Sequence, residues 1–159
     1  MTKALGTDAV LLVADIDALA DAYAVRRDVF VVEQGVPSEL ELDSFDATAD
    51  HLVAYDRERA IGAARLVVEA AGFEGSDPAY GPVAHLGRIA VRSQARGRGL
   101  GVALVAALEA RAVERGLRIC ALSSQTHALG FYERLGYLAH GPQFDDAGLP
   151  HRWMTKLLP

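Results

Sequence analysis

A turn rich in glycine and arginine, set between an expected strand and an expected helix, most constrains how this chain can fold. This glycine turn covers residues 94–101 and reads Gln-Ala-Arg-Gly-Arg-Gly-Leu-Gly. The apolar run 83–91 before it is typical of a strand, and leucines recurring every four residues after it predict a helix over 100–115. Glycines allow a ligand close to the backbone, and amides at a helix start are unpaired. The glycine turn therefore predicts an anion site suited to a phosphate or pyrophosphate.

Two common phosphate-binding motifs do not fit the glycine turn. A P-loop needs Lys and then Ser or Thr after its last glycine, and neither residue is present. The dinucleotide fingerprint needs two residues between its second and third glycines, whereas Gly97, Gly99 and Gly101 alternate here. From the residues alone, two readings stay open. Either Arg96 and Arg98 add charge-assisted hydrogen bonds to an anion site, or this is a tight turn with solvated arginines.

The rest of the chain alternates strand and helix patterns, which favours a single α/β or α+β domain over residues 1–159. Residues 39–50 read as an acidic connection, whose carboxylates either favour a cationic acceptor or form a solvated surface. The other strands are expected at 10–14, 51–55, 61–69, 117–122, 137–141 and 151–158, and the other helices at 18–32 and 128–135.

Composition narrows the classes of function. Hydrophobic residues make up 51% of the chain and charged residues 23%, which excludes disorder. A net charge of −5 argues against nucleic-acid binding, including binding through Arg88, Arg92, Arg96 and Arg98. The single Cys120 excludes an internal disulfide framework, and no spacing of His or Cys suggests a metal site. With no export-signal pattern and no apolar run of membrane-spanning length, we expect a cytoplasmic protein without membrane contact.

Two segments carry a family resemblance. Gln94-x-x-Gly97-x-Gly99 resembles the acyl-CoA signature of the GNAT N-acetyltransferase superfamily, and residues 86–91 resemble the strand that leads into it. Residues 131–137, Phe-Tyr-Glu-Arg-Leu-Gly-Tyr, resemble the second diagnostic segment of that superfamily. The chain also resembles a narrower group, the YjcF/ElaA-like GNAT proteins, at residues 29–37, 43–46 and 148–151. The resemblance spans nearly the whole chain.

The resemblance implies a GNAT fold of the α/β (α+β) class, with acetyl-CoA as co-substrate and no metal. Such a fold has a mixed central sheet of about six to seven strands flanked by helices, and acyl-CoA lies in a V-shaped splay between the central strands. The backbone of Ile89, Ala90 and Val91 would pair with the pantetheine arm. Gln125 stands where the family often has an Asn that contacts this arm. The pyrophosphate would be held by the amides of Arg96, Gly97, Arg98, Gly99, Leu100 and Gly101.

The implied activity is N-acetylation of a primary amine, by direct attack of the amine on the thioester in a ternary complex. Tyr132 matches the usual general acid of the family, which protonates the leaving thiolate. Glu33, His51 and His151 are the candidates for the base and for the substrate side of the site. Dimers are common in the superfamily, so a homodimer is compatible with this interpretation. The alternative is an acyl-CoA-binding sensor or partner module without turnover. Cys120, in an apolar strand, is expected to be a buried, inert thiol.

Overall fold

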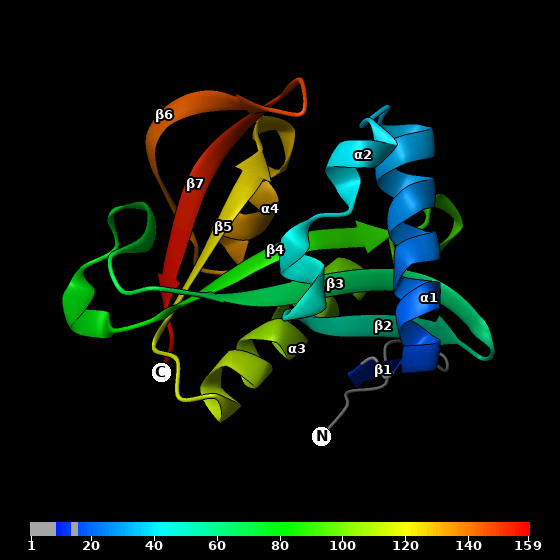
Figure 1. Cartoon of the computed structure of the whole chain (residues 1–159), viewed down its shortest axis with the longest axis horizontal. Helices are drawn as coiled ribbons and strands as arrows, with labels where there is room; N and C mark the ends of the chain where they lie inside the picture. Colours follow the sequence, from blue (N-terminus) through cyan, green and yellow to red (C-terminus); the bar gives the residue numbers. More distant parts are fainter. Residues whose placement is uncertain (1–8, 14–15) are drawn as a thin grey trace. The chain divides into compact units, whose positions relative to one another are not determined.

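The computed structural model describes residues 9–13 and 16–159 (Figure 1). A π-helical segment, Arg27–Glu33, continues the first helix. The four helices are α1 (Ile16–Arg26), α2 (Ser38–Glu41), α3 (Leu100–Glu114) and α4 (Leu129–Arg134). The strands are β1 (Ala9–Val13), β2 (Asp50–Asp56), β3 (Arg59–Glu69), β4 (Val83–Val91), β5 (Ile119–Gln125), β6 (Leu138–Asp146) and β7 (Leu149–Leu157).

The strands form a mixed sheet with the order β1-β2-β3-β4-β5-β7-β6. The pair β4–β5 is parallel, whereas β1–β2, β2–β3, β5–β7 and β6–β7 are antiparallel. This topology confirms the expected α/β fold class. The chain divides into two compact units, Met1–Leu66 with Arg88–Leu108 and Val67–Gly87 with Glu109–Pro159. The single domain expected from the sequence stays a prediction.

In the first unit, α1 and the π-helical segment pack on one face of β2 and β3. Val53 and Ala63 are partners in the antiparallel register, so their side chains point to the same face of the sheet. The buried cluster on this face consists of Ala22, Val25 and Val29 from the helical side, with Val53, Ala60, Ala63 and Ala90 from the strands. The short alanine side chains let the helix lie close to the sheet.

The start of α3 packs on the other face of these strands. A Cβ at Gly62 would lie 3.2 Å from the side chains of both Leu100 and Leu104. Both leucines are buried, as their recurrence every four residues predicts. The glycine in β3 thus lets the first turns of α3 approach the strand, and this contact holds the end of the glycine turn.

In the second unit, β7 lies between β5 and β6. The β5–β7 register runs without interruption from Ile119–Leu157 to Gln125–His151. By contrast, the parallel register of β4 with β5 joins only Ala84 to Cys120 and His85 to Ala121, although β4 continues to Val91. Within the described part of the chain, no helix is both long and apolar enough to span a bilayer.

Candidate functional site

The glycine turn has the backbone shape that an anion site needs. Gly97 and Gly99 have φ of 80° and 78°, which L side chains rarely adopt. A Cβ at either position would meet nothing within 4 Å, so this backbone is open on its outer side. Because α3 begins at Leu100, the amides of its first turn have no partner inside the helix. The turn therefore fits the phosphates of the co-substrate that the sequence predicts.

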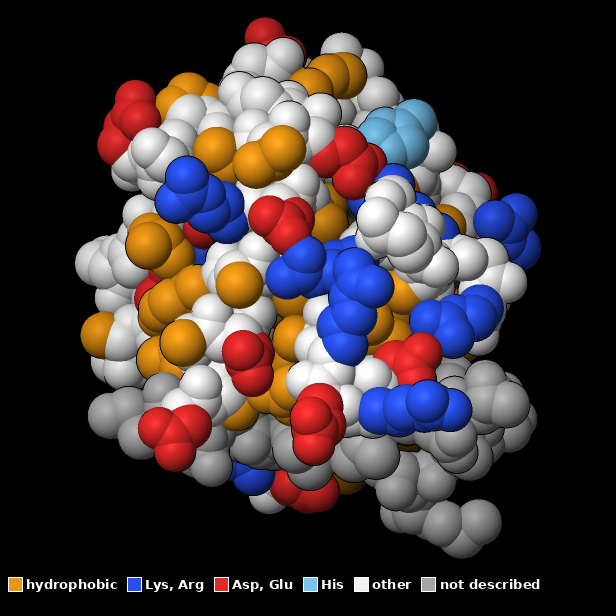
Figure 2. Space-filling model, turned by 90° about the vertical axis from the view of Figure 1, so that its right-hand side faces the viewer, with side chains coloured by type: hydrophobic (Ala, Val, Ile, Leu, Met, Phe, Trp, Pro, Cys, Tyr) orange, Lys and Arg blue, Asp and Glu red, His pale blue; other side chains and the backbone are white. Residues whose placement is uncertain are grey.

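Each arginine near the turn is paired with a carboxylate from another segment. Arg96 donates from Nη1 and Nη2 to Glu33 at 2.7 and 2.8 Å. Its Nε donates to the Val91 carbonyl at 3.0 Å. Arg92 pairs with Asp28, and Arg98 lies 3.4 Å from Asp56. Figure 2 shows Lys and Arg side chains gathered at the centre of one face with Asp and Glu side chains beside them. Arg96 and Arg98 are thus exposed, at 44% and 42%, and each also has a carboxylate beside it.

The pair of Glu33 and Arg96 bears on the proton chemistry expected of Glu33. The hydrogen bond from Arg96 lowers the pKa of Glu33, which makes this carboxylate a weak base. Both side chains stay substantially exposed, at 42% and 44%. An exposed pair of this kind is worth about 0–1 kcal/mol, so a phosphate can compete for Arg96.

Strand β4 contains a backbone distortion directly before its predicted ligand-binding residues. Arg88 has φ of 50°, which is uncommon for a residue with a side chain and carries strain. Its side chain is anchored by donation from Nε and Nη2 to the Glu41 carbonyl, at 3.1 and 3.0 Å. Nη2 also reaches the Leu40 carbonyl at 3.3 Å and Asp43 at 3.2 Å. These bonds link the distorted point of β4 to α2 and the segment after it.

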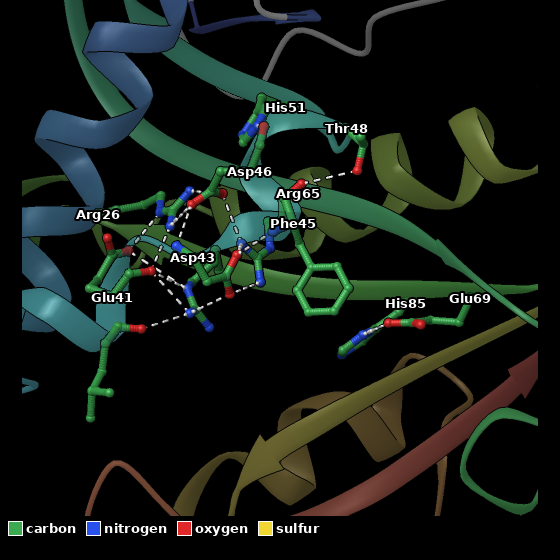
Figure 3. A network of polar contacts seen from close by, with 12 residues as sticks. Arg26, Glu41, Asp43, Phe45, Asp46, Thr48, His51, Arg65, Glu69 and His85 are labelled. Carbon is green, nitrogen blue, oxygen red and sulfur yellow. Dashed lines mark hydrogen bonds and ion pairs between the residues drawn. The ribbon is translucent and has the colours of Figure 1, made fainter.

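Arg88 belongs to a larger arginine–carboxylate network, which consists of Arg26, Glu41, Asp43, Asp46, Arg65 and Arg88 (Figure 3). Arg26 donates to Glu41 at 2.6 Å and to Asp46 at 2.7 Å. Arg65 donates to Asp43 at 2.7 Å and to Asp46 at 2.8 Å. Burial by itself would raise the pKa of Asp46, but the bonds from both guanidinium groups and from the Asp43 amide hold it well below its usual range.

The network corrects the interpretation of residues 39–50. Glu41 and Asp46 are buried, and each is paired with a buried arginine. They therefore belong neither to a solvated acidic surface nor to a set of free charges that would attract a cation. Sequence reasoning missed this network. The available signal was Arg65, a lone charge within the apolar strand Arg59–Glu69.

Both histidines proposed as bases are buried, and one ring nitrogen of each lies within hydrogen-bond distance of a backbone carbonyl. His51 Nε2 lies 2.9 Å from the Asp46 carbonyl, which only a protonated nitrogen can approach in this way. Its Nδ1 has no hydrogen-bond partner among the described residues. His151, in the second unit, places Nδ1 2.8 Å from the Leu149 carbonyl, and its ring stacks on Phe144 at 6.0 Å. In a neutral ring, the nitrogen that would carry the lone pair is Nδ1 of His51, which is itself buried, and Nε2 of His151.

Tyr132 lies on α4 in the second unit. Its ring packs edge to face against Phe131 at 4.9 Å and against Tyr137 at 6.0 Å. Burial raises the pKa of Tyr132 to about 12, so its hydroxyl stays protonated at neutral pH. Gln125, in the same unit, is the last residue of β5 and the register partner of His151.

Cys120 is fully buried, as expected, and burial raises the pKa of its thiol to about 12. No group of three or more His, Cys, Asp or Glu side chains in the described ranges could hold a metal ion. The first unit contains Glu33, His51, Ile89–Val91 and the glycine turn. The second contains Gln125, Tyr132 and His151.

Comparison with known proteins shows the family to which this chain belongs. The chain matches the family model of the acetyltransferase (GNAT) domain over residues 18–158. It therefore belongs to the GNAT acetyltransferase family and is an acyltransferase. It is 38% identical over 141 residues to the uncharacterized N-acetyltransferase YjcF of Bacillus subtilis, which covers 88% of this chain and 93% of that one.

Two solved structures show the same fold. An acyl-CoA N-acyltransferase of Pseudomonas aeruginosa is 28% identical with a TM-score of 0.76, over 94% of this chain and 98% of that one. ElaA of Escherichia coli is 23% identical with a TM-score of 0.74, over 94% of this chain and 98% of that one. Membership of the GNAT superfamily and its YjcF/ElaA-like group is thus confirmed, and the family uses acetyl-CoA as co-substrate.

Proposed function

We propose that this protein transfers an acetyl group from acetyl-CoA to the primary amine of a small acceptor, by direct attack in a ternary complex. The observation that carries the proposal is the glycine turn. Gly97 and Gly99 hold a backbone that only glycine adopts easily, with open space outside it, at the start of α3. The amides at the start of α3, next to a turn of this shape, suit a bound phosphate group.

Binding of acetyl-CoA is assigned to two stretches of the first unit. The amides of residues 96–101 hold the pyrophosphate, and the main chain of Ile89, Ala90 and Val91 pairs with the amides of the pantetheine arm as a strand would. Gln125 contributes a further contact to this arm.

In the proposed reaction the amine nitrogen forms a bond to the thioester carbon, the C–S bond breaks, and the CoA thiolate leaves. Tyr132 is proposed to donate its hydroxyl hydrogen to this sulfur. Its pKa of about 12 lies well above the roughly 8.5 of a thiol, so complete proton transfer is uphill. We therefore assign Tyr132 mainly to hydrogen bonding of the developing thiolate, with positioning of the reactants supplying more of the rate.

The amine must lose a proton before or during its attack. In its neutral form His151 would carry a lone pair on Nε2, so it can accept this proton directly or through water. His51 is less well placed, because its Nδ1 is buried without a hydrogen-bond partner among the described residues. Glu33 is the weaker candidate while Arg96 lowers its pKa.

Calorimetric titration of acetyl-CoA tests the binding site. We expect micromolar binding to the natural chain and at least about 100-fold weaker binding to Gly99→Asp, since the new carboxylate repels phosphate. Gly75→Asp is the matched control, because Gly75 has a φ of 77° and equally open surroundings but lies outside the turn. Absence of binding at millimolar acetyl-CoA would contradict the proposal.

Tyr132→Phe tests the chemistry separately from binding. We expect kcat for release of the free thiol to fall by about 10²-fold or more, with the Kd for acetyl-CoA unchanged. Tyr80→Phe controls for the loss of a hydroxyl elsewhere in the second unit. An unchanged kcat would remove Tyr132 from the reaction.

A further inference from the structure

Arg88 differs from the other two arginines of the network in how its charge is compensated. Arg26 is 1% exposed and Arg65 6%, and each donates to two carboxylates at 2.6–2.8 Å. Arg88 is 25% exposed and approaches carboxylates only at 3.2 Å, to Asp43, and 3.7 Å, to Glu41. Both of these carboxylates are already held by another guanidinium group.

The electrostatic setting of Arg88 agrees with this difference. Burial together with the neighbouring Arg65 and Arg26 lowers the pKa of Arg88. Hydrogen bonds to carboxylates instead raise the pKa values of Arg26 and Arg65, against the effect of their burial. The three carboxylates of the network thus lie closer to Arg26 and Arg65 than to Arg88.

One nitrogen of Arg88 is open. Nε and Nη2 make all of its hydrogen bonds within the described residues, and Nη1 makes none. The side chain is nonetheless fixed, because its other two nitrogens hold the carbonyls of Leu40 and Glu41. Arg88 directly precedes Ile89–Val91, the residues proposed to bind the pantetheine arm. Arg88 is therefore a held, partly exposed side chain whose Nη1 makes no hydrogen bond, at the residue that adjoins the proposed site in the sequence.

We propose that Nη1 of Arg88 binds a carboxylate of the acceptor, so that the substrate is an amine that carries a carboxylate, such as an amino acid. This inference rests on the proposed function and names the class of its acceptor. The phosphates of acetyl-CoA have their own donors in the glycine turn. The two N–H groups of a single nitrogen suit a singly charged carboxylate, whereas a phosphate dianion demands more donors than this edge offers.

Matched acceptors test the inference. Release of the free thiol from acetyl-CoA is followed with each of the twenty amino acids, its carboxamide and the amine that lacks the carboxyl group. We expect at least one acid to exceed its carboxamide in kcat/KM by on the order of 100-fold, because the neutral analogue leaves Arg88 unpaired. A carboxamide or plain amine that equals every acid overturns the inference.

Variants of Arg88 provide a second test of this inference. In Arg88→Met the KM for the preferred acid is expected to rise by on the order of 100-fold while its carboxamide is unaffected, and Arg88→Lys restores part of the preference. A purely structural role would instead affect acid and carboxamide alike. If Arg88→Met does not fold, the comparison of acceptors on the natural chain still decides.

Binding separates this inference from the proposed function. Calorimetry with the same acids is carried out on the free protein and on the protein loaded with CoA. Failure of acetyl-CoA to bind, with acids still bound in an Arg88-dependent way, overturns the proposed function alone. Acetyl-CoA binding without binding or turnover of any acid overturns the inference about Arg88 alone.

Discussion

At the edge of the glycine turn, Glu33 accepts the kind of hydrogen bonds from Arg96 that a phosphate group would accept. Its two oxygens accept from Nη1 and Nη2 of the same guanidinium group. Because the pair is exposed, its net stabilisation is small, and a phosphate dianion carries more charge than one carboxylate. Entry of acetyl-CoA into the turn would then release Glu33 and let its pKa rise toward the ordinary value.

Removing the charge of Glu33 should therefore favour the co-substrate. We expect Glu33→Gln to tighten acetyl-CoA binding by about three- to tenfold at low salt, because Arg96 no longer has a competing anion. Calorimetry at two salt concentrations measures the effect. Glu114→Gln changes the net charge equally at an exposed partner of Arg111 and should leave the Kd unchanged. Weaker binding in Glu33→Gln would show that Glu33 supports the turn.

The sequence predicts the bounds of helices and strands where these depend on residues close together in the chain. Strand Val83–Val91 has the expected bounds, and α3 ends one residue before the expected position. Here apolar periodicity and glycines act over a few residues. The network was not predicted, because its partners lie far apart in the chain: 15 residues separate Arg26 from Glu41, and 47 separate Glu41 from Arg88. Residues 39–50 carry no local sign of which carboxylates become buried.

The contact between β3 and α3 gives a second expectation. Gly62→Val would add side-chain atoms where even a Cβ lies 3.2 Å from Leu100 and Leu104. We expect a loss of about 1–3 kcal/mol in the free energy of unfolding, measured by urea denaturation. Gly130→Ala, on α4 with nothing within 4 Å of the new Cβ, is the control and should be neutral or stabilising. Unchanged stability in Gly62→Val would mean that α3 can shift without cost.

For the whole molecule, the network sets the response to acid. The pKa values of Asp43 and Asp46 are lower in the folded protein than the 3.8 of a free side chain. Their contribution to stability is present above about pH 4 and is lost as pH falls through the folded pKa values. We expect Asp46→Asn to lower the free energy of unfolding at pH 7 by roughly 3–5 kcal/mol, since it breaks a buried pair. The same variant should also show a weaker dependence of the free energy of unfolding on pH, measured by denaturation between pH 7 and 3. The exposed Asp145→Asn should change neither quantity.

Alkaline pH is expected to lower the stability of the second unit. The thiol of Cys120 and the hydroxyl of Tyr132 both have pKa values raised to about 12 by burial. The contribution of these two groups to stability is complete below their pKa values in the unfolded chain, 9 for the thiol and 10 for the hydroxyl. It declines as pH rises from there toward 12. We expect Cys120 to resist a thiol reagent at pH 8 until the chain unfolds, with the reaction rate following urea denaturation. Rapid labelling of the folded protein would contradict the burial of this thiol.

The balance of the network also limits how the sequence can change over time. Arg26, Arg65 and Arg88 face Glu41, Asp43 and Asp46, and Asp46 accepts from two arginines at once. Loss of any buried member leaves a desolvated charge without its counterpart, which costs far more than the pair contributes. We therefore expect single replacements of these buried members to be destabilising. Replacement of the linked members together by apolar residues should carry a smaller penalty. Substitutions at these positions should accumulate together, so that they vary among relatives as linked sets and not one at a time.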